Sequence, residues 1–359
     1  MLSPKVDCHS NRAVLLIEDR SLNSSARLGI VRAMAPTYPR LMQMANACGE
    51  SRAVLAANDL DVFTVIGTGG RTAGEIAKRC KADPEGVRLL LNALAGLGLL
   101  SRRGTRYHNT PLGRRYLDRR SPTSISNLLW LLGHHWHDWT KLPQSLRKGR
   151  PGWAPVTGSP AFRRRFSLAM HERSHVLAAP TVATLRLPPR SRRFLDLGGG
   201  PGSYAIALAR RHPNLEGVVL DQAVTVARQL IRKHRLEKRL RARAGSIFTA
   251  PLGSGYDAVL VSNVIHVFNA KENRTLLKRV RDALRPGGKV FIVEFFLDDS
   301  RTQPPKSSLF ALMMYLFTGS GQCYSWSETE GWLKALGFGR FKRSRITPDI
   351  GTLEATKLP

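Results

Sequence analysis

The sequence contains little cysteine. Four cysteines occur among 359 residues, and they lie far apart at Cys8, Cys48, Cys80 and Cys323. None belongs to a C-x-x-C pair or to a cysteine–histidine cluster, which argues against a structural zinc site and a disulfide framework. We therefore expect no bound metal ion and a reducing compartment, the cytoplasm.

Long apolar runs are missing as well. Hydrophobic residues make up 42% of the chain, which is enough to form packed cores. No stretch approaches the roughly 20 apolar residues that a membrane-spanning helix requires. The first 35 residues lack the order of charged region, apolar region and cleavage site that marks a secretory signal. We expect no membrane association and no export.

Acidic residues are scarce relative to basic ones. The chain has 26 Asp and Glu against 56 Lys and Arg, a formal charge of +30, and the excess is spread over both halves. Such a field attracts nucleic acids and anionic surfaces. A general preference for arginine explains the same excess without any partner, and we favour that interpretation. We expect no specific nucleic-acid partner.

The length favours two domains, and the patterning divides the chain into four segments. Residues 1–35 have no clear period and are expected to be a disordered leader. Residues 36–120 are expected to form a winged-helix domain, and residues 121–190 a helical linker that helps to cover a ligand. Residues 191–359 are expected to form an α/β domain with a doubly wound sheet.

The winged-helix prediction depends on local signals. Helical spacing begins at Tyr38 and is expected to end at residues 61–63. Thr72 and Glu75 form a capping box, and Pro84 stands at the first position of a second helix. Residues 99–108 then have the pattern of strand, turn and strand. Such a unit binds DNA in some proteins and forms dimers in others, and these residues alone do not decide between the two.

A cluster of histidine and tryptophan occupies residues 130–139 in the linker. It could form a metal site, but no pair of histidines with a carboxylate partner shares a helix face. We expect these side chains to pack the domain junction, with some of them lining a substrate pocket together with Phe310, Met313, Met314 and Phe317. Their size favours an aromatic or polycyclic small molecule.

The strongest motif is a glycine-rich turn at residues 198–202. A buried strand ending in Asp196-Leu197 precedes it, a helix from Ser203 to Arg211 follows, and the next strand ends at Asp221. This is a strand–helix–strand unit with an acidic residue at the end of its second strand. Gly198, Gly200 and Gly202 would let the backbone approach a ligand closely, and Asp221 can accept hydrogen bonds from ribose hydroxyls.

The same turn argues against a nicotinamide dinucleotide. The sequence D-L-G-G-G-P-G-S differs from G-x-G-x-x-G, and Asp196 would repel a pyrophosphate. A carboxylate at this position suits a cationic ligand that carries an amino group, directly or through water. S-adenosyl-L-methionine is such a ligand, and we expect it to be the cofactor.

Two candidate catalytic residues follow later strands of the same sheet. His266 comes just after a strand at residues 257–261, and Glu294 ends a strand at residues 289–294. Parallel strands end at one edge of such a sheet, where ligands bind. A histidine base with a carboxylate to orient it is a common arrangement, and a phenol with a pKa near 10 needs a base at neutral pH.

These motifs together resemble a family of O-methyltransferases that includes plant caffeate and flavonoid enzymes and bacterial hydroxyneurosporene and polyketide enzymes. The resemblance extends over residues 36–359 and is carried by L-D-L-G-G-G-P-G-S, by His266, and by D-A-L-R-P-G-G-K-V-F-I-V-E at residues 282–294. It implies a Rossmann-like methyltransferase sheet of seven strands with the last antiparallel. It also implies a homodimer with interlocked winged helices, His266 as general base and Glu294 as its orienting carboxylate.

The sequence departs from the family pattern at three positions. Val267 follows the histidine where the family usually has Asp, and Cys323 stands near the place of a second catalytic Glu. In the G-D-x-F motif, whose Asp contacts adenine, the chain has Gly245-Ser246-Ile247-Phe248. Ser246 and Phe248 are the expected cofactor contacts in that motif.

Two other functions were weighed. A nucleic-acid methyltransferase would use an N-P-P-Y-like stretch or a Pro-Cys nucleophile, and neither occurs in this chain. A winged-helix regulator with a decayed enzyme domain conflicts with the intact glycine turn, His266 and Glu294. The favoured function is methyl transfer to a hydroxyl of an aromatic or polycyclic molecule in secondary metabolism.

Overall fold

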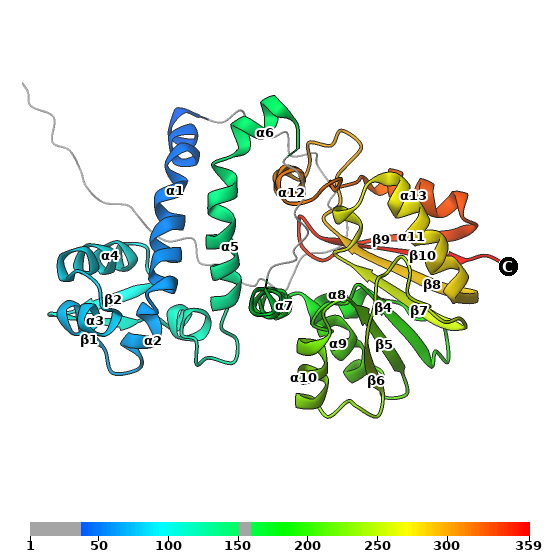
Figure 1. Ribbon diagram of the computed structural model, residues 1–359, viewed down its shortest axis with the longest axis horizontal. Coiled ribbons are helices and arrows are strands. Elements are labelled where there is room, and N and C mark those ends of the chain that lie inside the picture. The colour runs from blue at the N-terminus through cyan, green and yellow to red at the C-terminus, as the bar shows by residue number, and fades with distance from the viewer. Residues whose placement is uncertain (1–36, 151–158) are drawn as a thin grey trace, which may run out of the picture. The chain divides into compact units, whose positions relative to one another are not determined.

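The computed structural model describes residues 37–150 and 159–359. The expected leader at residues 1–35 lies outside the described residues. The chain divides into two units after Ala47, and helix α1 (Tyr38–Asp59) begins in the first. The second unit, Cys48–Pro359, contains both β-sheets (Figure 1).

The N-terminal part of this unit combines short helices with a three-stranded sheet of order β1-β3-β2. Thr72 caps α3 and forms the expected capping box with Glu75, while Asp83 caps α4 ahead of Pro84. One expectation is wrong, because Val62 and Phe63 begin a new helix after a left-handed Asp61. The elements are α2 (Val62–Ile66), β1 (Arg71–Thr72), α3 (Ala73–Cys80), α4 (Pro84–Gly96), β2 (Leu100–Arg103), β3 (Arg106–Asn109) and the π-helix η1 (Gly113–Leu117).

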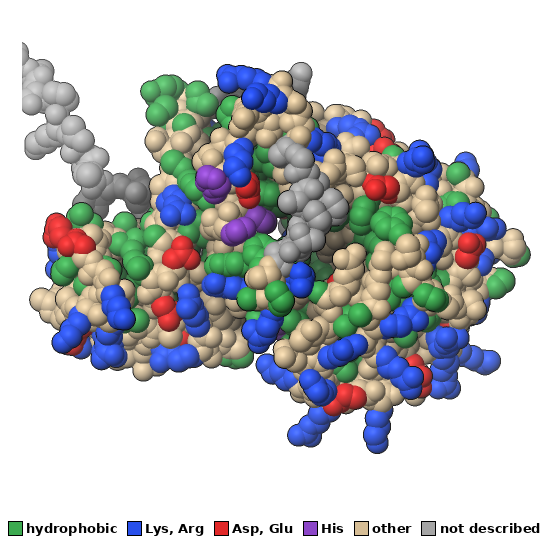
Figure 2. Space-filling view, viewed as in Figure 1, with side chains coloured by type: hydrophobic (Ala, Val, Ile, Leu, Met, Phe, Trp, Pro, Cys, Tyr) green, Lys and Arg blue, Asp and Glu red, His purple; other side chains and the backbone are tan. Residues whose placement is uncertain are grey.

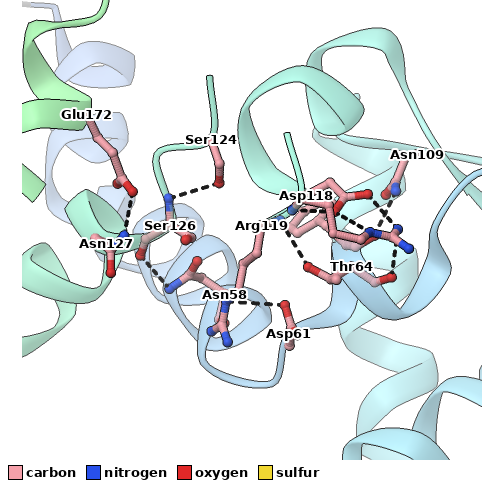
Figure 3. Close-up of polar contacts among 12 residues, drawn as sticks. Asn58, Asp61, Thr64, Asn109, Asp118, Arg119, Ser124, Ser126, Asn127 and Glu172 are labelled. Atoms are coloured by element: carbon pink, nitrogen blue, oxygen red, sulfur yellow. Dashed lines mark hydrogen bonds and ion pairs between the residues drawn. The ribbon is translucent and has the colours of Figure 1, made fainter. Parts of the chain in front are cut away.

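Four helices of the described residues then lead to the large sheet. They are α5 (Ser126–Trp139), α6 (Leu142–Lys148), α7 (Pro160–Ser174) and α8 (Ala178–Thr184). The carboxylate of Glu172 on α7 accepts hydrogen bonds from the side chain of Asn127 and the backbone N–H of Leu128 in the first turn of α5 (Figure 3). The start of α5 is therefore fixed against the end of α7.

The large sheet has seven strands in the order β6-β5-β4-β7-β8-β10-β9, with β10 antiparallel to both neighbours. This is the doubly wound Rossmann-like arrangement, with the last strand in the chain antiparallel. The strands are β4 (Arg193–Leu197), β5 (Glu216–Asp221), β6 (Leu240–Ala244), β7 (Tyr256–Ser262), β8 (Leu284–Glu294), β9 (Phe338–Arg345) and β10 (Gly351–Lys357).

Helices cover both faces of this sheet (Figure 1). Because successive side chains of a strand point to opposite faces, Leu195 and Val259 belong to one core, and Phe194 and Leu260 belong to the other. The first core is closed by α11 (Ala270–Ala283) and α13 (Trp326–Ala335), and the second by α8, α9 (Ser203–Arg211) and α10 (Thr225–Lys233). Strands buried on both faces explain the nearly continuous apolar runs in the sequence.

Three elements differ from what the sequence pattern indicated. Edge strand β6 has the arginine-rich sequence LRARA and was not recognised, because only one residue in it is fully buried. Helix α12 (Pro305–Phe317) carries Phe310, Met313 and Phe317, which had been assigned to a pocket without a secondary structure. Strand β8 begins at Leu284, earlier than the expected start at residue 289, because residues 285–288 continue the strand directly after α11.

The basic side chains are distributed over the visible surface and do not form a single stripe (Figure 2). None of the helices in residues 37–150 and 159–359 is both long and apolar enough to cross a membrane.

Candidate active site

The predicted site residues gather at one edge of the large sheet. Strands β4, β5, β6, β7 and β8 are mutually parallel where they pair, so their carboxyl ends share an edge. The glycine turn follows β4, Asp221 ends β5 and Ser246 follows β6. His266 follows β7, and Glu294 ends β8. Residues far apart in the chain therefore meet where such sheets bind ligands.

The glycine turn depends on backbone conformations that other residues avoid. Gly198, Gly200 and Gly202 have φ angles of 72°, 51° and 73°, in the left-handed region that glycine enters without steric cost. A Cβ atom on Gly198 would stand 2.7 Å from Val264 Cγ2. The turn is closed by a hydrogen bond from the N–H of Gly202 to the carbonyl of Gly199 (N to O, 2.8 Å).

Asp196 lies beneath this turn and is completely buried. A Cβ atom on Gly199 would come within 2.5 Å of its carboxylate, so a fourth glycine that had not been singled out is what admits the acid. Neither carboxylate oxygen is paired in a well-formed hydrogen bond with a described residue. Burial and the nearby charge of Asp221 raise the pKa of Asp196 from 3.8 to about 7, and the N–H of Ala205 only partly opposes this rise.

Asp221 is held in place by backbone donors. Its carboxylate accepts hydrogen bonds from the N–H groups of Gly200 (3.0 Å) and Ala223 (2.9 Å). Burial raises its pKa, and these backbone donors oppose the rise. Each oxygen retains a lone pair that a ligand hydroxyl can use. Asp221 therefore connects the glycine turn to the end of β5.

The segment after β6 lies against Asp221 as well. The N–H of Gly245 donates to the carbonyl of Asp221 (N to O, 3.0 Å). Ser246 Oγ accepts from the N–H of Phe248 (3.2 Å), so this serine caps its own turn. The ring of Phe248 meets Phe268 edge-on with centroids 4.9 Å apart. The segment thus brings an aromatic ring and a hydroxyl to the edge, but no charge.

His266 and Glu294 form a buried pair. His266 Nδ1 lies 2.7 Å from Glu294 Oε1, with the histidine 7% exposed and the glutamate fully buried. Glu294 Oε1 also accepts from the N–H of Phe295 (2.9 Å). An ionised carboxylate can only accept a hydrogen bond, so it pairs with the tautomer in which Nδ1 is the donor, and Nε2 is then the ring nitrogen that faces away from Glu294. Nε2 has no hydrogen-bond partner among the described residues.

Three residues that the sequence did not mark hold the turn that carries His266. Asn273 on α11 donates to the carbonyls of Ile265 (2.9 Å) and Phe268 (3.1 Å), and the hydroxyl of Tyr324 also donates to Phe268 (2.6 Å). A Cβ atom on Gly321 would lie 2.1 Å from the carbonyl oxygen of His266. Only a glycine lets the chain pass this closely, so the position of His266 is fixed from both sides.

Aromatic rings surround the histidine. Phe310 on α12 meets the ring of His266 edge-on (centroids 4.9 Å apart), and Phe295 packs against Phe310 (4.2 Å). Farther along α12, Phe317 stacks on His135 of α5 (4.2 Å). Burial lowers the pKa of His135 to about 4, so this residue is a neutral ring at physiological pH. The groups of three or more acidic, cysteine or histidine side chains that hold metals do not occur in the described residues.

Cys323, at the position near a family glutamate, is also part of this neighbourhood. It is 1% exposed, and burial together with the charge of Glu294 raises the pKa of its thiol. It therefore contributes a small neutral group to the surroundings of the His266–Glu294 pair.

Helix α7 supplies two contacts that no sequence signal indicated. His171 Nδ1 lies 2.8 Å from the hydroxyl of Ser203, the first residue of α9 after the glycine turn. Arg173 lies over the rings of Phe295 and Phe310, with its Cζ 4.8 Å and 5.7 Å from their centroids. Both residues stand in an arginine-rich helix whose buried face is set by tertiary packing, which explains why they were missed.

Comparison with known proteins identifies the class. An O-methyltransferase domain matches residues 139–339, and an O-methyltransferase dimerisation domain matches residues 42–119. The chain belongs to this family, and it is an S-adenosylmethionine-dependent O-methyltransferase.

Individual relatives are similar to this chain over most of its length. The tetracenomycin polyketide synthesis 8-O-methyl transferase of Streptomyces glaucescens is 30% identical over 86% of this chain and 94% of its own length. The acetylserotonin O-methyltransferase of Mus musculus molossinus is 33% identical, covering 86% of this chain and 85% of its own. Human N-acetylserotonin methyltransferase, solved with S-adenosylmethionine, superposes with a TM-score of 0.82 at 26% identity, over 91% of this chain and 99% of that one.

Proposed function

We propose that this enzyme methylates a hydroxyl group of an aromatic or polycyclic small molecule, with His266 as general base and Glu294 as its orienting carboxylate. The observation that carries the proposal is the buried 2.7 Å contact between His266 Nδ1 and Glu294 Oε1. It directs the unprotonated Nε2 away from the glutamate, and a base needs a free lone pair aimed at the proton that it removes.

The glycine edge, which we define as the glycine turn at residues 198–202 with Asp196 and Asp221, fits S-adenosylmethionine. Asp196 is a buried carboxylate with no well-formed partner, which is costly unless a cation compensates it. Because Gly199 covers it, we expect Asp196 to act on the amino group of the cofactor through water or through the field beneath the turn. Asp221 is proposed to hold ribose hydroxyls, Ser246 and Phe248 to contact adenine, and Gly198, Gly200 and Gly202 to admit the cofactor to the backbone.

When bound, S-adenosylmethionine supplies an electrophilic methyl group, so the protein has to position the acceptor and remove its proton. His266 accepts that proton on Nε2. Glu294 stabilises the imidazolium that results, because its carboxylate accepts from Nδ1 in a buried setting where charge–charge attraction is strong. The surrounding rings of Phe295 and Phe310 limit the access of water.

The acceptor is proposed to be large and flat. The ring of Phe310 lies beside the base, and the stacked rings of His135 and Phe317 extend the aromatic lining between α5 and α12. Of the relatives, one is named for tetracenomycin polyketide synthesis and others for acetylserotonin, both of which suit an aromatic acceptor. A role in secondary metabolism follows from the same reasoning.

The domain plan is part of the proposal. Residues 36–120 would form a homodimer, residues 121–190 would cover the acceptor, and residues 191–359 would carry out catalysis. Homodimers are expected in light scattering of the purified protein, and a monomer at micromolar concentration would contradict this part.

The test of the proposal is transfer of labelled methyl groups to a panel of phenols and hydroxylated polycycles, each paired with its O-methylated counterpart. Only the free hydroxyl should accept label. His266→Ala should lower turnover by about 100-fold or more while the affinity for S-adenosylhomocysteine stays unchanged. His234→Ala, at the end of α10, is the matched control. Unchanged turnover in His266→Ala would show that another residue is the base.

A further inference from the structure

Arg173 is a positive charge placed in apolar surroundings. It lies near the end of α7, and its guanidinium stacks over Phe295 and Phe310, the latter being the ring that meets His266. Burial lowers the pKa of Arg173, while the nearby Tyr204 and Glu294 oppose that shift. The side chain remains partly exposed, so a ligand can reach it.

This guanidinium has no hydrogen-bond or ion-pair partner among residues 37–150 and 159–359. Glu294 attracts it, and Glu294 Oε2 has no hydrogen-bond partner of its own, but the two side chains form no ion pair with each other among the described contacts. Planar N–H donors that are held over aromatic faces and left without an acceptor match the geometry of an incoming carboxylate.

Unpaired arginines are common in this chain, so the absence of a partner is informative only where water is also scarce. With 56 basic and 26 acidic residues, many arginines must stay unpaired on the surface, where water solvates them. Arg173 differs because protein atoms replace much of that water. A charge that has lost part of its water is disfavoured unless a counter-charge compensates it.

The neighbours of Arg173 fix the helix that presents it. Glu172 accepts from Asn127 Nδ2 (2.5 Å) and from the N–H of Leu128 (2.8 Å), as Figure 3 shows for Asn127. His171 is bonded to Ser203 on the other side. Consecutive residues of α7 are therefore bonded in two directions, and these contacts oppose a rotation of the helix that would release Arg173 to solvent. Its position is prepared before a ligand binds.

We infer that Arg173 binds a carboxylate in the active site, carried either by the acceptor or by the amino-acid part of the cofactor. The inference rests on the proposed function, since it places the carboxylate beside His266 and the glycine edge. If the acceptor carries it, the enzyme selects hydroxylated aromatic acids over neutral phenols. If the cofactor carries it, Arg173 completes the cofactor site from α7.

The experiment is calorimetric titration with two matched ligand pairs. S-adenosylhomocysteine is compared with 5′-methylthioadenosine, which lacks the carboxylate together with the amino group and the chain that carries them. Hydroxynaphthoic acids are compared with their amides in the presence of S-adenosylhomocysteine. The variants are Arg173→Met, which keeps a long side chain without the charge, and Arg173→Lys, which keeps the charge without the planar pair of N–H donors. Arg193→Met is the control, because Arg193 stacks on Tyr256 at the opposite end of the sheet.

Arg173→Met should remove a roughly 10- to 100-fold preference for the carboxylate member of one pair, the size expected for hydrogen bonds between charged groups. Arg173→Lys should remove part of it, and Arg193→Met none. Loss in the first pair assigns the carboxylate to the cofactor, and loss in the second assigns it to the acceptor. If neither wild-type preference falls in Arg173→Met, or if the wild type shows none, the inference is wrong. These are binding measurements, so they stay separate from turnover by His266.

Discussion

The two sides of the active site are built in opposite ways. The proposed cofactor side is mostly backbone, formed by one continuous stretch from β4 through α9 to β5, and its charged groups are the carboxylates of Asp196 and Asp221. The proposed acceptor side is made of side chains from α5, α7 and α12, with aromatic rings and a partly exposed guanidinium. One side is anionic and the other is apolar with a cation.

This difference indicates how each side selects its ligand. A backbone site fixes the shape of one ligand, because the φ angles of the glycine turn and the covered Asp196 leave little room for change. Side chains on separate helices can be exchanged one at a time without disturbing the sheet. Such a division permits relatives to share one cofactor while they act on different acceptors.

The largest effect should come from the residue that orients the base. Glu294→Gln keeps an oxygen near His266 Nδ1 but removes the charge, so the imidazolium formed during proton transfer loses its stabilising partner. We expect turnover to fall by about 100-fold, with the dissociation constant of S-adenosylhomocysteine and the KM of the acceptor changed less than threefold.

A merely structural role for Glu294 would give a different pattern. It would lower the thermal stability and weaken cofactor binding together with turnover, because β8 is central to the sheet. Glu354→Gln is a useful control, since Glu354 is another buried glutamate of the same sheet, paired with Lys289 by a 2.6 Å contact. Glu354→Gln should not lower turnover selectively: any change in turnover should be matched by the change in cofactor affinity.

An intermediate effect is expected on the cofactor side from Asp196→Asn. The pKa of Asp196 is raised to about 7, so a bound cationic ligand should favour its ionised form. The affinity of the wild type for S-adenosylhomocysteine should therefore rise as the pH increases from 6 to 8. In the variant the affinity should fall about tenfold at pH 8, and this part of its pH dependence should disappear.

The pH dependence of folding stability should run opposite to that of cofactor affinity. A carboxyl group with a folded-state pKa above its unfolded value favours folding only while it is protonated, so it costs stability as the pH rises from about 4 to 7. Ligand-free Asp196→Asn should therefore melt at a higher temperature than wild type at pH 8, and at a similar temperature at pH 4. A variant that is less stable at pH 8 would contradict the buried, unpaired state of Asp196.

The same comparison explains what the sequence could and could not reveal. The turn at residues 198–202 and Asp221 follow from local spacing, whereas the sheet of seven strands was implied by the family resemblance, and the fold prediction is confirmed. The structure also brings His266 and Glu294 together, but their catalytic roles stay predictions. Arg173, Gly199 and Gly321 were missed, because their importance arises from atoms distant in the chain or from a close approach that no pattern encodes.

The smallest effect should come from the contact that joins the two sides, His171 Nδ1 to Ser203 Oγ at 2.8 Å. His171→Gln should weaken S-adenosylhomocysteine binding only about threefold, because α7 then supports the glycine turn less firmly. His135→Gln is the matched control for that affinity. Burial lowers the pKa of both histidines to about 4, but His135 stacks on Phe317 and does not touch the turn. The folded protein keeps each histidine neutral, whereas the unfolded chain protonates it more easily, so each histidine contributes stability that is lost as the pH falls from about 6.5 to 4. In both variants the melting temperature should therefore depend less on pH in that range, while only His171→Gln should change cofactor affinity. Equal affinity losses in the two variants would mean that the cofactor and acceptor sides are coupled through general packing, and not through this hydrogen bond.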